Sequence, residues 1–482
     1  MHFSLDKNSK YAVMQGDLLD EIREHFSVKN DAAPYTKRFN RFVPTRYYAI
    51  TPTGRFDPSL LSEILKQLIS YSGNITIDNN LLAVVSPSQT TWQKKAFFTT
   101  DPYRLTLELR DYQAEIVRAC LMKGRGTVVL ATAGGKTLAM ASLISRVSTF
   151  YTPDEKFKCL VIVPDLGLVT QTYNDFKSYG VPFTVSMWTG NNDLNLASDV
   201  IIANAGILQS EKSNTTWINF VDLLIVDEVH KSRKGNKIAD IIKNIKTPCK
   251  FGFTGTMPEN LLDQWNIIGK IGPVLYEKNS DALRKEKYIA DVLCQIIELD
   301  HKNLPEPVED KMKAYRSELE FIIASPFRNK LIAKIANNVK NNCLILIDFI
   351  KHGNILKEEL IKNCTSKQIF FIQGSVEVDE REKIRHLMEA NDNIVVIAIS
   401  KIFSTGINIK NLHYIVFAGG GKAKIKVVQS IGRGLRLHPS KIKLRLLDIA
   451  DNLKYGNKHA RKRQNLYEKE GIPFISEKIK ET

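Results

Sequence analysis

A lysine and a threonine follow a glycine pair where an apolar run ends. The residues Thr132-Ala133-Gly134-Gly135-Lys136-Thr137 come directly after the run Thr127–Ala131 and before a stretch rich in Ala, Leu and Ile. A glycine-rich turn between a strand and a helix points backbone N–H groups and the positive helix end at a phosphate. Lys136 would add a charge to the β- and γ-phosphates of a nucleoside triphosphate, and the Thr137 hydroxyl would hold Mg²⁺. Leu130 replaces the first glycine of the full P-loop pattern, so the loop taken alone also fits a plain strand-to-helix turn.

A pair of acids makes hydrolysis the favoured interpretation of that loop. Asp227 and Glu228 follow the apolar run Leu223–Val226, and His230 comes two residues later. Carboxylates at the carboxyl end of a neighbouring strand lie where an open parallel sheet forms its ligand crevice. Asp227 would hold Mg²⁺, directly or through water, and Glu228 would position and deprotonate an attacking water. The alternative is two exposed acids that end a strand.

Two arginines in the last quarter of the chain lie three residues apart. They are Arg433 and Arg436 in Gln429-Ser430-Ile431-Gly432-Arg433-Gly434-Leu435-Arg436. On a helix this spacing turns both side chains to one side. A guanidinium suits the charge that develops on a γ-phosphate better than an ammonium does. We therefore select both as candidate arginine fingers, Arg436 ahead of Arg433, against the alternative of a solvated basic helix face.

These groups need a scaffold that brings strand ends together. From Val128 onward, short apolar runs alternate with amphipathic stretches, a pattern typical of a parallel sheet with helices on both faces. The pattern begins again after the charged stretch His301–Lys311, so a second α/β domain is expected. The expected strands are Thr127–Ala131, Leu160–Val163, Val200–Ala203, Leu223–Val226 and Phe251–Thr254, then Leu344–Ile347, Ile369–Ile372, Ile394–Ala398, Tyr414–Ala418 and Leu444–Asp448.

Both ends of the chain differ from this pattern. Residues 1–105 predict a helix near Leu18–Phe26, a basic and aromatic loop-rich segment, and a helix near Leu60–Ser70, which together favour a small α+β domain. The C-terminal residues predict a basic helix followed by a short tail. We expect an α/β fold with boundaries at 1–105 for the N-terminal domain, 106–300 and 301–455 for the two α/β domains, and 456–482 for the basic helical tail.

The motifs resemble those of superfamily 2 helicases and recur in order from Arg110 to Arg436. The resemblance implies two tandem RecA-like domains, with ATP and Mg²⁺ bound between them and arginines from the second completing the site of the first. Leu109–Gln113 resembles the adenine-contacting segment, which implies that Gln113 reads the base edge and Tyr112 is available to stack. The further nucleotide-site residues that the resemblance implies are Arg110, His230, Gly406 and Gln429.

Two other motifs carry the resemblance further. Thr254-Gly255-Thr256 is similar to motif III, whose hydroxyls couple the nucleotide site to the nucleic-acid site, and Ser404–Asn408 resembles motif V. Asn204 and Asn408 stand where the family commonly has Thr and Asp, respectively. Leu109–Gln113, Gly272–Tyr276, Ile402–Ile407 and Gln429–Arg436 resemble phage UvsW-type recombination helicases most closely. That resemblance implies a motor that moves Holliday junctions, unwinds displacement loops and RNA–DNA loops, and regresses stalled forks.

Residues 1–105 would fill the place of that family's small DNA-binding domain. The segment Tyr35–Phe56 combines cations and aromatic residues with no acid, so it offers both phosphate contacts and stacking faces. The alternatives for this segment are a packed aromatic core and a solvated basic face. The basic run near the C-terminus could also follow a phosphate backbone, with a solvated basic face as the alternative. The candidate nucleic-acid contacts are Lys37, Arg38, Phe39, Arg41, Phe42 and Arg46, then Lys458, Arg461, Lys462 and Arg463.

Composition agrees with a polyanionic partner. The 482 residues carry 68 Lys and Arg against 52 Asp and Glu, a net charge of +16. This favours DNA, branched or duplex, or an RNA–DNA hybrid, with recombination or replication proteins as further candidate partners. The apolar runs are too short to span a membrane, and the six cysteines show no paired spacing, which favours the cytoplasm, that of the host if the chain is viral.

The residues leave three other functions open. One is an RNA helicase, although motif II is not Asp-Glu-Ala-Asp here. Another is the motor subunit of a nuclease complex, although the chain shows no separate nuclease cluster. The third is a DNA-binding module with a degenerate ATP pocket, which retention of Lys136, Asp227, Glu228 and Arg436 disfavours.

Overall fold

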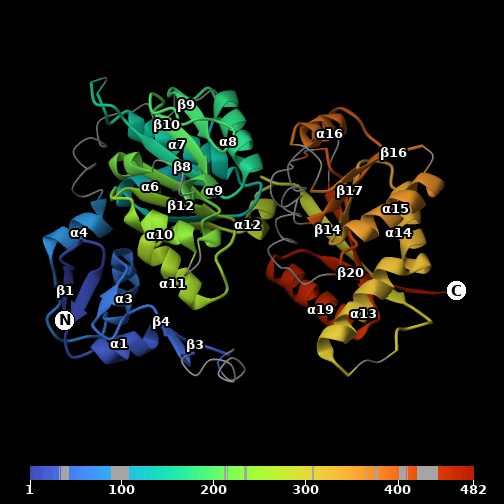
Figure 1. Ribbon diagram of the computed structural model, residues 1–482, viewed down its shortest axis with the longest axis horizontal. Coiled ribbons are helices and arrows are strands. Elements are labelled where there is room, and N and C mark those ends of the chain that lie inside the picture. Colours follow the sequence, from blue (N-terminus) through green and yellow to red (C-terminus); the bar gives the residue numbers. More distant parts are fainter. Residues whose placement is uncertain are drawn as a thin grey trace. The chain divides into compact units, whose positions relative to one another are not determined.

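The protein forms two compact units in the computed structural model (Figure 1). The first comprises Met1–Leu130 and Gly135–Glu277, and the second Ala131–Gly134 and Lys278–Thr482. The structure describes residues 1–31, 33, 43–87, 108–152, 154–210, 213, 215–232, 236–306, 309–364, 366–374, 378–400, 409, 411–420 and 443–481.

The N-terminal part of the first unit is the small α+β domain that the sequence predicts. Its four-stranded sheet has the order β5-β2-β1-β6, and β3 and β4 form a separate antiparallel hairpin. Phe3, Met14, Phe26 and Ile64 are at most 1% exposed in its core. The elements are β1 (His2–Leu5), β2 (Ala12–Gln15), α1 (Leu19–His25), β3 (Ser27–Lys29), β4 (Arg46–Tyr48), β5 (Arg55–Phe56), the 3-10 helix η1 (Pro58–Leu60), α3 (Leu61–Gln67), β6 (Thr76–Ile77) and α4 (Asn79–Val85).

The rest of the first unit is an α/β domain around a seven-stranded sheet of order β13-β7-β12-β11-β8-β10-β9. The pairings from β7 to β9 are all parallel, as the continuous apolar runs predict. Its strands are β7 (Gly126–Leu130), β8 (Cys159–Val163), β9 (Val185–Trp188), β10 (Val200–Asn204), β11 (Leu223–Asp227), β12 (Lys250–Thr254) and β13 (Val274–Lys278). Its helices are α6 (Asp111–Lys123), α7 (Lys136–Ser148), α8 (Leu166–Ser178), α9 (Ala205–Leu208), η3 (Thr216–Phe220), η4 (Val229–Lys231), α10 (Lys237–Asn244) and α11 (Leu261–Lys270).

The second unit contains another seven-stranded sheet, of order β16-β17-β15-β18-β19-β14-β20, and all its neighbouring strands pair in parallel. Its strands are β14 (Asp291–Asp300), β15 (Cys343–Ile347), β16 (Gln368–Ile372), β17 (Ile394–Ile399), β18 (Tyr414–Phe417), β19 (Lys443–Asp451) and β20 (Phe474–Lys480). Its helices are α12 (Ser280–Lys285), α13 (Lys311–Ala324), α14 (Pro326–Asn338), α15 (Ile350–Asn363), α16 (Val378–Ala390) and α19 (Lys454–Lys469).

Two expectations about the second unit need correction. The predicted boundary at residue 300 falls too late, because β14 pairs with β19 and β20 and so belongs to the second sheet. The basic C-terminal helix is confirmed as α19. The residues after it do not form a free tail, however, because β20 pairs along β14 as the edge strand of that sheet.

Candidate functional site

The order of the strands brings the predicted nucleotide-site groups to one edge of the first sheet. β12 lies between β7 and β11, and its Phe253 is in register with both Val128 and Asp227. Three neighbouring parallel strands therefore end close together. The start of α7 follows β7, β12 ends at Thr254, and β11 ends at Asp227. Such carboxyl ends are where open α/β sheets bind ligands.

The backbone of the phosphate loop is held in an unusual conformation. Ala133 has φ +68° and Gly135, which directly precedes α7, has φ +81°. The φ of Gly135 lies in the left-handed region that favours glycine, and a Cβ there would also lie 2.3 Å from the Gln113 Nε2, so the glutamine side chain would have to move. Left-handed residues between right-handed ones turn successive N–H groups into one concavity, which suits an anion at the helix N-terminus.

Lys136, Glu228, His230 and Thr254 form a cluster at this edge. The Lys136 Nζ lies 4.0 Å from Glu228 Oε1 and donates to the Leu130 carbonyl at 3.4 Å. The His230 Nδ1 lies 3.2 Å from Glu228 Oε2 and 2.8 Å from the Thr254 hydroxyl. His230 is 2% exposed. The contact between motif II and motif III could not be predicted from the sequence, because a hydroxyl at a strand end carries no signal of its partner.

The neighbouring acids Asp227 and Glu228 have pKa values displaced in opposite directions. Burial and the neighbouring charge of Glu228 raise the pKa of Asp227 to about 6. Burial also acts against the charge of Glu228, but Lys136 and His230 outweigh it and lower the pKa of Glu228 to about 2. Asp227 is thus a partly buried carboxylate without enough nearby positive charge.

This under-compensated carboxylate fits a magnesium ion. Mg²⁺ prefers oxygen ligands and is commonly bound by one or two protein groups together with substrate phosphates. Asp227 and the Thr137 hydroxyl supply oxygen donors of that kind. Within the described part of the chain no group of three or more His, Cys, Asp and Glu side chains is placed to hold a metal by itself.

The adenine-contacting segment forms the start of α6. The Gln113 Oε1 accepts from the Arg110 N–H at 3.0 Å, and its Nε2 donates to the Gly135 carbonyl at 3.3 Å. Gln113 therefore links α6 to the phosphate loop, and base reading by it remains a prediction. The expectation that Tyr112 is available to stack is wrong, because its ring is 2% exposed and packs inside the domain.

Many of the predicted site residues lie outside the described residues. These are Gly406, Gln429, Arg433 and Arg436 for the nucleotide, and Lys37, Arg38, Phe39, Arg41 and Phe42 for nucleic acid. Their assignments remain predictions from the sequence.

The described candidate contacts to nucleic acid lie on β4 and α19. Arg46 is exposed, donates to the Ser27 hydroxyl from two nitrogens, and lies 3.6 Å from Glu24 Oε2, which offsets part of its charge. Lys458, Arg461 and Lys462 are exposed on α19. They form a basic surface that is able to follow a phosphate backbone.

Arg463 corrects the prediction for that helix. It is 2% exposed, and its Nε and NH2 donate to both carboxylate oxygens of Asp448 at 2.7–3.0 Å. Tyr467 donates to the same carboxylate at 2.7 Å. Arg463 therefore faces the core and is not placed to contact a nucleic acid.

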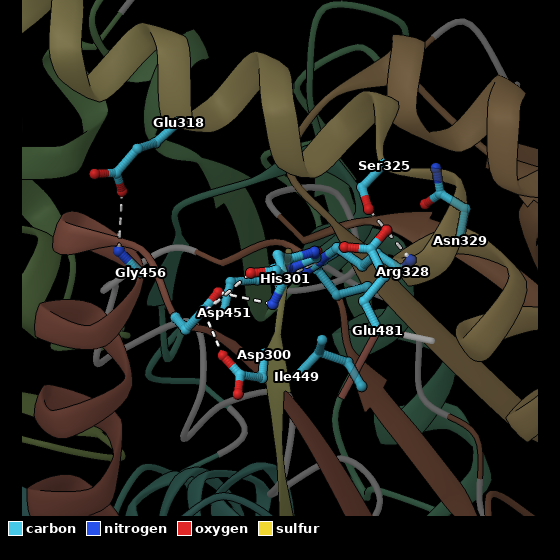
Figure 2. A network of polar contacts seen from close by, with 12 residues as sticks. Asp300, His301, Glu318, Ser325, Arg328, Asn329, Ile449, Asp451, Gly456 and Glu481 are labelled. Atoms are coloured by element: carbon cyan, nitrogen blue, oxygen red, sulfur yellow. Dashed lines mark hydrogen bonds and ion pairs between the residues drawn. The ribbon is translucent and has the colours of Figure 1, made fainter. Parts of the chain in front are cut away.

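A second buried network lies beside it at the carboxyl end of the second sheet (Figure 2). The Arg328 Nε donates to Asp451 Oδ1 at 3.0 Å, and the His301 Nε2 lies 3.0 Å from the same oxygen. Arg328 NH2 also donates to the Ala418 carbonyl at 2.9 Å. Burial acts against the charge of Asp451, but Arg328 and His301 lower the pKa of that carboxyl below its ordinary value. The acids in the apolar run of β19 were a signal for this network, because a buried acid needs a partner.

Comparisons with known proteins agree with the two domains. Residues 106–259 match the model of "Type III restriction enzyme, res subunit", and residues 328–438 match "Helicase conserved C-terminal domain". Among the described residues, every helix is too short or too polar to cross a bilayer.

Curated relatives extend the similarity beyond those models. The chain is 27% identical over 452 residues to the ATP-dependent DNA helicase uvsW of Enterobacteria phage T4, which covers 90% of this chain and 86% of that protein. It is 26% identical to the DNA 3'-5' translocase XPB2 of Sulfurisphaera tokodaii, over 68% of this chain and 79% of that protein. The fold resembles the ATP-dependent Type ISP restriction-modification enzyme LlaBIII, with a TM-score of 0.55 and 14% identity over 93% of this chain and 36% of that one.

The chain belongs to the superfamily 2 helicases, which are ATP-dependent motors. Its two domains with parallel sheets, its phosphate-loop cluster and its matches to the two helicase domain models in chain order all agree with this class. Within that superfamily it is a DNA helicase related to uvsW of phage T4.

Proposed function

We propose that the chain is a motor that remodels branched DNA, including Holliday junctions, D-loops, R-loops and stalled forks, in recombination, repair and replication. The observation that carries this proposal is the likeness to a phage DNA helicase over 90% of the chain, which is more than the two motor domains that many helicases share. The resemblance to UvsW-type motifs supports branched DNA as the substrate class.

The chemistry at the first sheet would hydrolyse ATP. The backbone N–H groups before α7 and the Lys136 ammonium would bind the phosphates, and Glu228 would orient and deprotonate the attacking water. The low pKa of Glu228 keeps it ionised and able to accept a hydrogen bond from that water. Thr137 and Asp227 would hold Mg²⁺, which when bound draws charge from the phosphates. Arg433 and Arg436 would stabilise the charge that develops on the γ-phosphate.

Two parts of the chain would contact the DNA backbone. One is the hairpin β3–β4 with its Arg46 and the neighbouring sequence candidates Lys37, Arg38 and Arg41. The other is the exposed side of α19, whose three cations are free of the core contacts that hold Arg463. Contacts of this kind give affinity for any phosphate backbone, so preference for a branch depends on how these surfaces are spaced.

Steady-state ATPase with a panel of polymers tests the proposal. The panel is no nucleic acid, single-stranded DNA, duplex DNA, a four-way DNA junction and RNA, all at one stated salt concentration because binding to phosphates depends on salt. We expect the junction to stimulate turnover most strongly and Glu228→Gln to abolish that stimulation. Stimulation by RNA alone would indicate an RNA helicase, and the absence of any stimulation would contradict a nucleic-acid motor.

A further inference from the structure

Helix α11 lies between the ATP site and the N-terminal domain. On one side it contacts η4, the 3-10 helix that carries His230, and on the other it contacts η1 of the N-terminal domain. Figure 1 shows α11 on the side of the α/β domain that adjoins the N-terminal sheet and its helices. One helix thus touches both the element that follows the catalytic acids and the domain to which we assign DNA contacts.

The apolar contacts between α11 and the N-terminal domain are close. Ile268 of α11 belongs to the N-terminal hydrophobic core, and the rings of Trp265 and Phe26 lie 5.0 Å apart. A Cβ at Gly269 would lie 2.6 Å from the Cβ of Asp57, so this glycine permits the approach of η1. Met257, next to the motif III residue Thr256, packs against both the N-terminal core and the core of the α/β domain. A displacement of η1 would therefore press directly on α11.

Polar contacts run through α11 from one side to the other. The Asn266 Nδ2 donates to the Ser232 carbonyl at 2.8 Å, and the Ser232 N–H closes η4 by donating to the Val229 carbonyl at 2.9 Å. The Asn266 Oδ1 accepts from the Lys270 ammonium, which also donates to Asp57 Oδ2 at 2.9 Å. Asn266 is 8% exposed, so water does not easily replace these bonds.

The side-chain amide of Asn266 joins Ser232 at the end of η4 to Lys270, which contacts Asp57 of the N-terminal domain. This amide is planar, so its oxygen and nitrogen cannot move independently. A displacement of Asp57 that pulled on Lys270 would therefore turn the amide and shift the bond to Ser232. That bond fixes the end of η4, on which His230 contacts Thr254 and lies beside Glu228.

We propose that Asn266 and Lys270 are positioning residues that couple the N-terminal domain to the catalytic acids, so that DNA held by that domain raises the kcat of ATP hydrolysis through α11. The inference rests on the proposed function, because it needs an ATPase that DNA stimulates. It assigns the N-terminal domain a second role, in which the domain sets the rate of hydrolysis as well as holding DNA.

Two lysines provide a matched pair of variants. Lys270 and Lys243 both reach Asp57, at 2.9 Å and 3.3 Å, and their side chains are 10% and 15% exposed. Of the two, Lys270 is the one that donates to Asn266. Lys243 instead lies over the Tyr11 ring at 3.1 Å, so its removal also weakens the attachment of the N-terminal domain. The pair separates attachment of the domain from its connection to motif II.

The experiment measures ATPase with and without a four-way DNA junction for Lys270→Met and Lys243→Met. We expect Lys270→Met to lower the ratio of DNA-stimulated to basal kcat about five- to tenfold, while the KM for ATP and the affinity for the junction keep their wild-type values. Lys243→Met should keep the wild-type ratio, and Lys270→Arg, which retains the donors, should recover most of it. Equal loss in the two Met variants would show that attachment alone matters and would overturn the inference.

A second variant guards against a folding defect in Lys270→Met. Asn266→Ala should lower the same ratio, and combining it with Lys270→Met should lower the ratio no further, because both changes break one connection. Additive losses in the double variant would contradict the connection. A wild-type enzyme that no DNA stimulates would refute the proposed function itself, whereas a stimulated wild type with fully stimulated Lys270→Met and Asn266→Ala refutes only the link through α11.

Discussion

Charged side chains gather at the carboxyl ends of both parallel sheets, partly buried at the first and fully buried at the second, and they are paired differently. At the first sheet the Lys136 ammonium lies 4.0 Å from Glu228, and the pKa of Asp227 is raised to about 6 by burial and a like charge. At the second, Arg463 binds Asp448 with bonds as short as 2.7 Å, and the pKa of Asp451 is lowered despite its burial. The first arrangement leaves a carboxylate in need of a cation, whereas the second satisfies its acids within the chain.

The backbone shows the same contrast. Ala133 and Glu228 are two of the five non-glycine residues with positive φ in the described part of the chain, and both lie at the first site. Strain of this kind persists where function requires it. Burial of charge therefore does not by itself identify an active site. Incomplete pairing together with a strained backbone does so here.

The largest expected effect is the loss of ATPase activity in a variant of the first site whose fold stays stable. Lys136→Ala removes the cation from the phosphates, so we expect ATPase to fall about 10³-fold while DNA binding is retained. Steady-state ATPase and equilibrium DNA binding check this. Substantial residual ATPase would contradict the assignment of the phosphate loop.

The opposite outcome is expected at the second sheet. Arg463→Met leaves Asp448 buried without its cation, which should lower the free energy of unfolding by about 3–5 kcal/mol. Denaturant unfolding measures this, with Lys136→Ala as the control that should lose much less. The double variant Asp448→Leu, Arg463→Met should recover part of the loss. If Arg463→Met is as stable as wild type and binds DNA more weakly, the structural role given to Arg463 is wrong.

A third prediction uses pH. Burial, followed by the charge of Arg328, lowers the pKa of His352 to about 3, while in the unfolded chain it titrates near 6.5. Between these two pKa values the unfolded state binds more protons than the folded state. Protonation of His352 in the unfolded chain therefore lowers the free energy of unfolding increasingly as the pH falls below 6.5, and it has little effect above that pH.

The substitution His352→Gln retains a donor for the Asn329 Oδ1, to which His352 is bonded at 3.1 Å, and removes the titration. We expect the slope of unfolding free energy against pH between 6.5 and 5 to decrease by up to about 1.4 kcal/mol per pH unit. Chemical denaturation at a series of pH values measures it. An unchanged slope would show that His352 is not held neutral in the fold.

The smallest expected effect concerns the exposed face of α19. The double variant Arg461→Gln, Lys462→Gln should weaken DNA binding a few-fold and reduce the slope of log K against log salt by about 0.9 for each phosphate that is no longer neutralised. Binding isotherms at several salt concentrations measure it. Arg46→Gln should have a smaller effect, because Glu24 already offsets part of that charge. A salt slope equal to wild type in the double variant would remove α19 from the DNA surface.

Local pattern was sufficient to predict much of this molecule. Most buried strands of both sheets were predicted because their apolar runs are continuous. The glycine-rich turn between β7 and α7 was also predicted, and its interpretation as a phosphate loop depended on the acids that follow β11. Four strands were missed: β9 and β13 at the edges of the first sheet, and β14 and β20 in the second. β20 is an edge strand with alternating charged residues, and its partner lies far away in the sequence.

The errors at individual residues have similar causes. Arg463 follows two exposed cations, yet it lies on the helix face of His459, Ala460, Leu466 and Tyr467, all of which are buried. The helical period predicts that Arg463 faces inward. Its pairing with Asp448 of β19 could not be predicted, because no pattern in the sequence indicates which buried acid the arginine contacts. Asn266 was not predicted as a site residue either. Its role depends on its contacts with Ser232 and Lys270, which the sequence alone does not indicate.

The most direct test of the central claim is migration of a synthetic four-way DNA junction, followed as the appearance of duplex products on a native gel. The wild type should form products with ATP and not with a non-hydrolysable analogue, and Glu228→Gln should form none with either. Absence of products from the wild type, or equal product formation without hydrolysis, would contradict a motor that uses this ATP site to remodel branched DNA.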